Sequence, residues 1–157
     1  MTQPTDNTLR VYFHSSWVSQ TKRGGWAFLM TRRDNENNLQ RSGLKGSASA
    51  TTQQTMELTA VVEAFRRINE RQLADRPITV YTSSNYINQG INTWLAGWKT
   101  NNWKGANKKT VKNAKLWQEL DKWNEEFKPT WELITNEGDH PAGTDVKAMA
   151  VTAGKGA

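Results

Sequence analysis

The feature that most constrains the fold of this chain is a change in the spacing of its apolar residues. In residues 9–13 apolar side chains alternate with Arg10 and Tyr12, which is the two-residue period of a β-strand. From residue 56 to residue 68 the spacing becomes helical, with charged residues on the opposite face. Further strands are predicted at residues 26–31, 39–45, 78–81 and 131–134. Because the chain contains both periods, we predict an α/β fold.

The links between these segments indicate how the sheet is connected. Gly24-Gly25 and residues 34–38 are polar turns, so the first three strands are predicted to form an antiparallel meander. The helix at residues 56–68, with Thr55 as its predicted N-cap, is a crossover that makes the fourth strand parallel to the first. Further helices are predicted at residues 85–89, 93–98, 116–127 and 145–152. The result is a five-stranded mixed sheet, with three antiparallel strands plus two parallel ones, flanked by helices.

Composition limits the classes of function. A chain of 157 residues forms one domain, which we place at residues 9–152 between a polar extension at 1–8 and a tail at 153–157. The chain has no Cys, which excludes disulfides, zinc–thiolate sites and thiol catalysis. The first residues lack the apolar core of a signal peptide, and no apolar run is long enough to span a membrane, so we expect a cytoplasmic protein without membrane partners.

The positive charge of the chain lies in one segment. The net charge is +6, and residues 99–115 hold six lysines and no acid, which accounts for the whole excess. Half of the eight tryptophans lie in or beside this segment, and we expect three of them, Trp94, Trp98 and Trp117, to pack in the core. Lysines neutralise phosphates and aromatic rings stack on bases, so the pattern favours a nucleic-acid partner. The predicted contacts are Lys99, Trp103, Lys104, Lys108, Lys109 and Lys112.

Several local motifs resemble type I ribonuclease H, the bacterial nuclease that cuts the RNA strand of RNA–DNA hybrids. They are TTQQTMEL at residues 51–58, YTSSNY at 81–86, QGI at 89–91 and the Trp/Lys series at 94–118. The resemblance implies a ribonuclease H-like fold in which residues 94–117 form a basic handle. It further implies a set of hydroxyl and amide side chains that contact the nucleic acid, at Gln20, Thr52, Gln53, Gln54, Asn85 and Gln89.

The same resemblance places the reaction site. The family uses four carboxylates to hold two Mg²⁺ ions, because hard cations take oxygen ligands. The four matching positions and the position of an assisting His are occupied here by His14, Glu57, Ser83, Lys147 and Glu137. Only Glu57 keeps a carboxylate among the four, and we expect Lys147 or His14 to pair with it. The resemblance therefore implies a catalytically inactive homologue without metal or cofactor.

These observations lead to the expectation of a non-catalytic protein that binds RNA–DNA hybrid, double-stranded RNA or single-stranded DNA. It would hold a hybrid or other A-like duplex without cleaving it, as a candidate subunit of a larger nucleoprotein assembly with protein partners. Two alternatives remain open. The first is a protein-interaction module that uses the same scaffold, with the basic segment meeting an acidic partner. The second is a weak nuclease in which Glu57, His14 and Glu137 hold one Mn²⁺ or Zn²⁺ ion.

Overall fold

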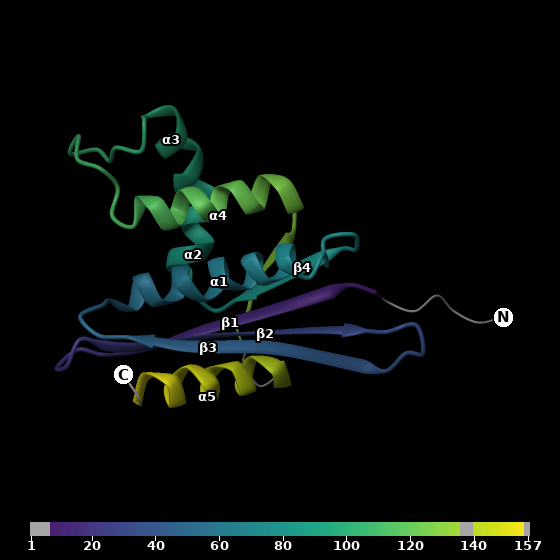
Figure 1. The fold of residues 1–157 in the computed structure, drawn as a ribbon. Coiled ribbons are helices and arrows are strands. Elements are labelled where there is room, and N and C mark those ends of the chain that lie inside the picture. The colour runs from purple at the N-terminus through teal and green to yellow at the C-terminus, as the bar shows by residue number, and fades with distance from the viewer. Residues whose placement is uncertain (1–6, 136–139, 156–157) are drawn as a thin grey trace.

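A five-stranded mixed sheet forms the centre of the molecule (Figure 1). The structure is a computed structural model and describes residues 7–135 and 140–155. Strands β1 (Leu9–Val18), β2 (Arg23–Arg33) and β3 (Leu39–Ala48) pair antiparallel in sequence order. Strand β4 (Ile78–Thr82) pairs parallel with β1, and β5 (Thr130–Leu133) pairs parallel with β4. The order β3-β2-β1-β4-β5 confirms the predicted fold class.

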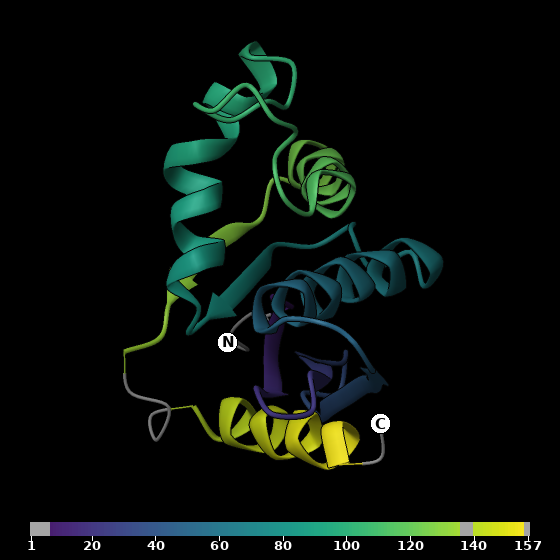
Figure 2. The same ribbon diagram turned by 90° about the vertical axis from the view of Figure 1, so that its left-hand side faces the viewer.

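Helices cover both faces of the sheet. Helix α1 (Gln53–Glu70) lies on one face and α5 (Pro141–Lys155) on the other, while α4 (Ala114–Phe127) packs on α1 (Figures 1 and 2). Helix α2 (Asn85–Gln89), the π-helical turn η1 (Gly90–Trp94) and α3 (Leu95–Thr100) follow one another away from the end of β4. In the part of the chain that the structure describes, no helix is long and apolar enough to cross a membrane.

Two apolar cores hold these layers together. The larger lies between the sheet and α1 and includes Phe28, Phe65 and Trp117, which are fully buried. The smaller lies under α5, where Tyr12 packs with Val146. Tyr12 is only 7% exposed, although its alternation with apolar residues suggested a polar face. Burial of both sheet faces explains the difference, because a strand covered on both sides needs no polar face.

Two predicted helix boundaries are wrong. Thr52, rather than Thr55, is the N-cap of α1, and its extended backbone lets its hydroxyl accept a hydrogen bond from the Thr55 amide at 3.1 Å. Helix α5 begins at Pro141 and ends at Lys155, well beyond the predicted residues 145–152. In both cases the helix extends beyond the apolar residues that predicted it. The short helical segment predicted at 93–98 is helical, as the end of η1 followed by α3.

Close packing fixes the helical segment that follows β4. A Cβ atom on Gly90 would overlap the ring of Trp117, so only glycine allows this approach. The Trp117 indole Nε1 donates a hydrogen bond to the Tyr86 hydroxyl at 2.8 Å. Trp94 and Trp98 are half-buried and pack against Tyr86 and Trp117. The predicted core role is confirmed for Trp117, which is fully buried, and for Trp98, which packs against the core, whereas Trp94 contacts Tyr86 and Trp98 at its margin.

Candidate nucleic-acid site

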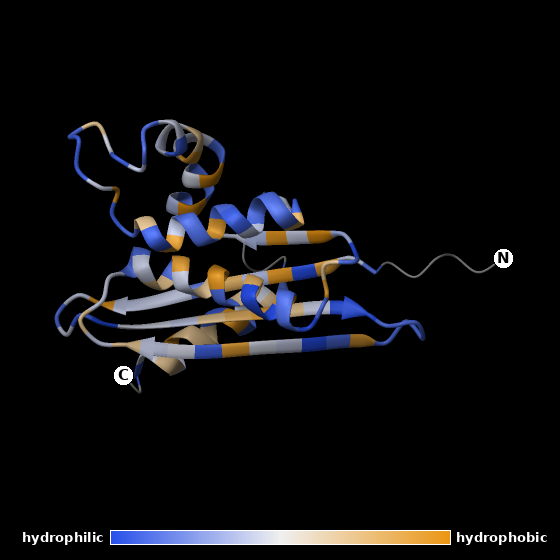
Figure 3. Cartoon of the chain, turned by 45° about the horizontal axis from the view of Figure 1, so that its top comes forward, coloured by the Kyte–Doolittle hydropathy of each residue, from blue (hydrophilic) through white to orange (hydrophobic). Residues whose placement is uncertain are grey.

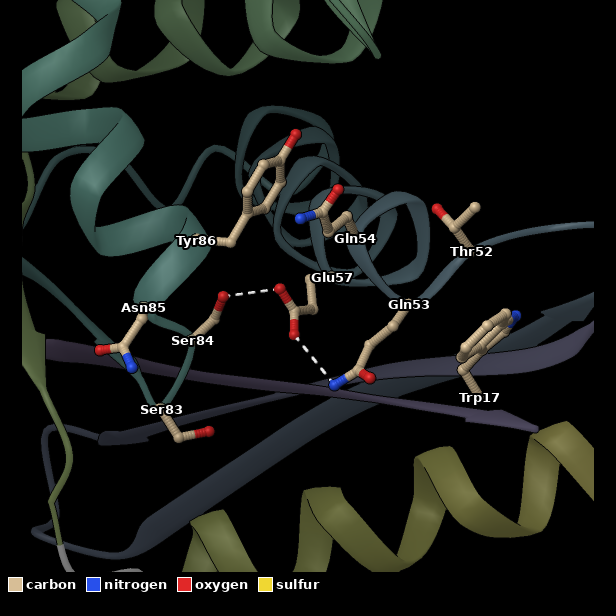
Figure 4. Close-up of a pocket in the computed structure, with 9 residues that line it drawn as sticks. All are labelled: Trp17, Thr52, Gln53, Gln54, Glu57, Ser83, Ser84, Asn85 and Tyr86. Atoms are coloured by element: carbon tan, nitrogen blue, oxygen red, sulfur yellow. Dashed lines mark hydrogen bonds between the residues drawn. The ribbon is translucent and has the colours of Figure 1, made fainter. Parts of the chain in front are cut away.

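A cleft of about 500 Å³ opens where β1 and β4 end and α1 and α2 begin (Figure 4). Because β1 and β4 are parallel, their carboxyl ends meet at this edge, where binding sites of open α/β sheets form. The sequence stretches that lead into α1 and α2 both contribute to the lining. The residues that line this cleft, called the Glu57 pocket below, are Trp17, Thr52, Gln53, Gln54, Glu57, Ser83, Ser84, Asn85 and Tyr86.

Among residues 7–135 and 140–155, Glu57 is the only carboxylate that lines this pocket. The Ser84 hydroxyl donates a hydrogen bond of 2.6 Å to its Oε2 atom, and the Gln53 amide donates a longer one of 3.4 Å to Oε1. Burial raises the pKa of the Glu57 carboxyl, and these two hydrogen bonds and the nearby His14 oppose that shift only in part. Ser84 is itself fixed, because its hydroxyl also caps α2 by accepting from the Ile87 amide at 3.1 Å.

The structure brings together three of the positions that the resemblance assigned to the reaction site. His14, Glu57 and Ser83 surround a small hollow of about 20 Å³ beside the middle of β1, where β4 ends. Of the two predicted partners of Glu57, Lys147 is exposed on α5 and donates neither of the carboxylate's two hydrogen bonds, whereas His14 lies near enough to act electrostatically on the Glu57 carboxyl. Lys147 donates neither because α1, which carries Glu57, and α5, which carries Lys147, cover opposite faces of the sheet (Figure 1). Glu137 lies outside the described residues.

Four of the six predicted hydroxyl and amide contacts line the pocket, namely Thr52, Gln53, Gln54 and Asn85. Gln20, in the turn after β1, and Gln89, at the end of α2, are exposed and are not part of this lining. Thr52 lies at the start of an 18-residue helix, where free backbone N–H groups favour an anion.

A hydrogen-bond chain links this helix start to the basic segment. The Thr52 and Thr55 hydroxyls lie 2.8 Å apart, and the Thr55 hydroxyl donates to Asn113 Oδ1 at 3.0 Å. Asn113 is the last residue before α4, in a left-handed backbone conformation. The pocket and the basic segment therefore share a structural connection.

Of the predicted handle at 94–117, residues 101–113 form an exposed loop between α3 and α4, and from here on the name handle means this loop alone. Its lysines Lys104, Lys108, Lys109 and Lys112 are exposed and form no ion pair with any described acidic residue. Most of the loop is hydrophilic (Figure 3). Backbone hydrogen bonds of 2.7 Å from Trp103 to Trp98 and 2.9 Å from Val111 to Trp103 hold the loop against α3. The handle therefore exposes lysines without ion pairs to described acids, on a backbone that hydrogen bonds hold in place.

Lys99 differs from the other predicted phosphate contacts. Its amino group lies 3.2 Å from both the Asp121 and the Glu125 carboxylates of α4. Asp121, followed by Glu125, raises the pKa of the Lys99 amino group. The structure therefore assigns Lys99 to a link between α3 and α4, because two carboxylates already neutralise its charge.

Three pocket residues were missed by sequence reasoning: Trp17, Ser84 and Tyr86. The predicted first strand ended at residue 13, whereas β1 continues to Val18 and places Trp17 beside the start of α1. Ser15 and Ser16 interrupt the apolar alternation of β1, so the pattern of apolar residues did not predict that the strand reaches Trp17. Ser84 belongs to the YTSSNY motif, but the motif predicted no function for it. For Ser84 and Tyr86, the only indication in the sequence was their place in that motif.

Comparison with known proteins decides the family. The model of the family described as RNase H matches residues 6–145. The chain belongs to the ribonuclease H family. Ribonuclease H of Treponema denticola is 36% identical over 92% of this chain and 96% of its own length. Ribonuclease H of Cupriavidus pinatubonensis is 39% identical over 89% of this chain and 90% of its own.

Solved structures show the ribonuclease H fold. LC9-RNase H1, described as a type 1 RNase H with the type 2 active-site motif, superposes with a TM-score of 0.83 at 26% identity, covering 99% of this chain and 75% of that one. LC11-RNase H1, solved in complex with RNA/DNA hybrid, gives a TM-score of 0.67 at 14% identity over 94% of this chain and 97% of that one.

These relatives contradict the expectation of a non-catalytic, inactive homologue. Curated relatives that are 36–39% identical over about nine-tenths of the chain are named Ribonuclease H, which indicates an enzyme. The absent carboxylates are those of one active-site arrangement. LC9-RNase H1 keeps the fold with a different active-site motif, so a departure from one motif does not establish the loss of activity.

The two-Mg²⁺ arrangement of the family nevertheless does not fit the side chains of the Glu57 pocket. Two adjacent divalent ions require several carboxylates to neutralise them. The described lining supplies one, and among residues 7–135 and 140–155 no three His, Asp or Glu side chains are placed to hold a metal ion. Apart from the aromatic side chains of Trp17 and Tyr86, the other described lining residues carry amides and hydroxyls, which suit hydrogen bonding to a sugar or phosphate better than neutralisation of paired cations.

Proposed function

We propose that this protein is a ribonuclease H that binds RNA–DNA hybrid and hydrolyses its RNA strand at the Glu57 pocket. The observation that carries the proposal is a single, partly buried carboxylate held by two hydrogen bonds, in a chain that also bears a cationic handle. Family membership supplies the reaction class, and solved members of the fold bound to RNA/DNA hybrid support the substrate class.

The handle and the start of α1 bind the substrate in this proposal. Exposed lysines at positions 104, 108, 109 and 112 neutralise backbone phosphates, which gives affinity without reading the base sequence. Thr52 and the amide side chains beside it offer hydrogen bonds at the start of α1, where the helix end favours a phosphate. The handle and the start of α1 together bind the sugar–phosphate backbone of a duplex.

Glu57 supports the chemical step. Its raised pKa makes it a better proton acceptor than an ordinary surface carboxylate, which suits a group that takes a proton from an attacking water. Ser84 orients this carboxylate through the 2.6 Å hydrogen bond. The described pocket residues do not fit the family's pair of metal ions. The roles of these side chains are therefore proton transfer for Glu57 and orientation of its carboxylate for Ser84.

The test is a cleavage panel with end-labelled RNA–DNA hybrid, double-stranded RNA, double-stranded DNA and single-stranded DNA. Each substrate is incubated with EDTA, Mg²⁺, Mn²⁺ or Zn²⁺, and the products are separated by length. We expect cleavage of the RNA strand of the hybrid, abolished by Glu57→Ala and retained by Glu70→Ala, which removes an exposed carboxylate from the same helix. Absence of hybrid cleavage under every condition, or cleavage that survives Glu57→Ala, contradicts the proposal.

A further inference from the structure

Trp17 forms one wall of the Glu57 pocket, and no step of the proposed reaction uses it. In Figure 4 its indole lies at one end of the pocket and Asn85 at the other, with Glu57 between them. Trp17 pairs with Gly24 in the register of β1 and β2, at the point where the antiparallel ribbon nears its turn. A large aromatic side chain therefore borders a cleft whose other walls are hydroxyls, amides and one carboxylate.

The indole of Trp17 is held in place by its surroundings. Its Nε1 atom donates a hydrogen bond of 2.9 Å to the Thr51 carbonyl oxygen, just before the start of α1. The Thr51 amide in turn donates to the Lys22 carbonyl oxygen at 2.9 Å, and the Lys22 amino group lies over the indole, 5.1 Å from its centre. A ring fixed in this way loses little conformational entropy when a ligand packs on it.

The chemistry of the pocket points to one kind of ligand. Aromatic side chains such as this indole stack on nucleobases or pack on the apolar face of a sugar, and this stacking tolerates any base sequence. Gln53, Gln54 and Asn85 supply donors and acceptors around the rest of the cleft. A volume of about 500 Å³ accommodates a ligand group of nucleotide size.

We propose that Trp17 is a strand-binding residue, on which a nucleoside unit of the bound nucleic acid packs next to the start of α1. The inference rests on the proposed function only for the identity of the ligand as nucleic acid. It assigns to Trp17 an uncharged contribution to affinity, distinct from the phosphate contacts of the handle.

The first experiment measures binding of fluorescently labelled RNA–DNA hybrid to Trp17→Ala and Trp17→Phe by anisotropy over a series of salt concentrations. Trp17→Ala is expected to raise Kd about tenfold at every salt concentration without changing the slope of log Kd against log salt, because no cation is removed. Trp17→Phe keeps an aromatic face and recovers most of the affinity.

The matched control is Trp131→Phe together with Trp131→Ala. Trp131 is also half-buried, and its indole also donates one hydrogen bond, to Asn124 Oδ1 at 2.8 Å, but it lies in β5 outside the pocket. We expect both variants to bind hybrid within about twofold of the unmodified protein. A Kd for Trp17→Ala within twofold of the unmodified protein overturns the inference, as does an equal loss in Trp131→Ala.

A second measurement uses the unmodified protein, so that it does not depend on the folding of a variant. Hybrid carrying 5-bromouracil in its DNA strand, or in its RNA strand in a parallel sample, is irradiated and the crosslinked peptides are mapped. A crosslink at Trp17 supports the inference, and crosslinks confined to the handle overturn it. Because binding and crosslinking do not require cleavage, a protein that crosslinks at Trp17 but cleaves nothing refutes the proposed function alone, whereas a protein that cleaves without using Trp17 refutes this inference alone.

Discussion

The Glu57 pocket and the handle differ in how each treats charge. The pocket holds one carboxylate whose ionisation burial disfavours, surrounded by neutral hydrogen-bonding groups. The handle carries four exposed lysines with no ion pair to a described acid. Affinity that depends on salt therefore belongs to the handle, while chemistry and short-range contacts belong to the pocket. Substitutions confined to one region at a time test this division of roles.

The largest expected effect comes from removing the pocket carboxylate. Glu57→Ala should lower the cleavage rate of hybrid by at least about a hundredfold, the usual scale of a lost proton-transfer group. The Kd for hybrid should change less than about threefold, since the phosphate contacts of the handle remain. Single-turnover cleavage and anisotropy on the same preparation check both values. A parallel loss of binding would show that the pocket and the handle are not separable.

The next effect concerns the handle. Replacing Lys104, Lys108 and Lys109 together by Gln should weaken hybrid binding by about ten- to a hundredfold near 100 mM salt, and each lost phosphate contact should lower the slope of log affinity against log salt by about 0.9. Lys122→Gln is the control, because it removes an exposed positive charge from α4, outside the handle. The amino group of Lys122 lies over the Trp123 ring. The slope for Lys122→Gln should match that of the unmodified protein. An unchanged slope in the triple variant would remove the handle from the substrate contacts.

The sequence predicted the fold better than the site, for reasons visible in particular residues. The strands and helices followed from apolar periodicity because burial determines both. The partner of Glu57 did not, since Ser84 reaches it from an element 27 positions further along the chain. Trp17 was missed because β1 continues through two serines that interrupt the apolar alternation. Counting carboxylates against one motif also led to the wrong conclusion about activity, because the site motif varies within the fold.

Lys99 and Lys104 lie in the same lysine-rich segment, and comparing them tests whether every lysine of that segment binds phosphate. Since Asp121 and Glu125 already neutralise its amino group, Lys99→Gln should leave the salt slope unchanged and alter Kd by less than about twofold. Lys104→Gln, the matched change within the handle, should lower the slope by about 0.9. Anisotropy titrations at four salt concentrations distinguish the two variants. Equal slopes for both would mean that the ion pairs of Lys99 open when nucleic acid binds.

The smallest expected effect is a pH-dependent difference in stability that arises from Glu57. Burial raises the pKa of this carboxyl above its ordinary value near 4.5, so the folded state binds its proton more tightly than the unfolded state does. The stabilisation linked to that proton is present below pH 4.5 and is lost as the pH rises through the folded-state pKa. Glu57→Gln carries no titrating group there, so it should be more stable than the unmodified protein at pH 8.

Urea unfolding of both proteins from pH 4 to pH 8 measures this difference. The stability gap between Glu57→Gln and the unmodified protein should be smallest at pH 4 and should grow until it levels off above the folded-state pKa. Glu70→Gln, an exposed change at the end of the same helix, controls for the loss of one negative charge. A gap of the opposite sign that widens with pH would mean that the Ser84 and Gln53 hydrogen bonds outweigh burial, and that the pocket stabilises the ionised carboxylate.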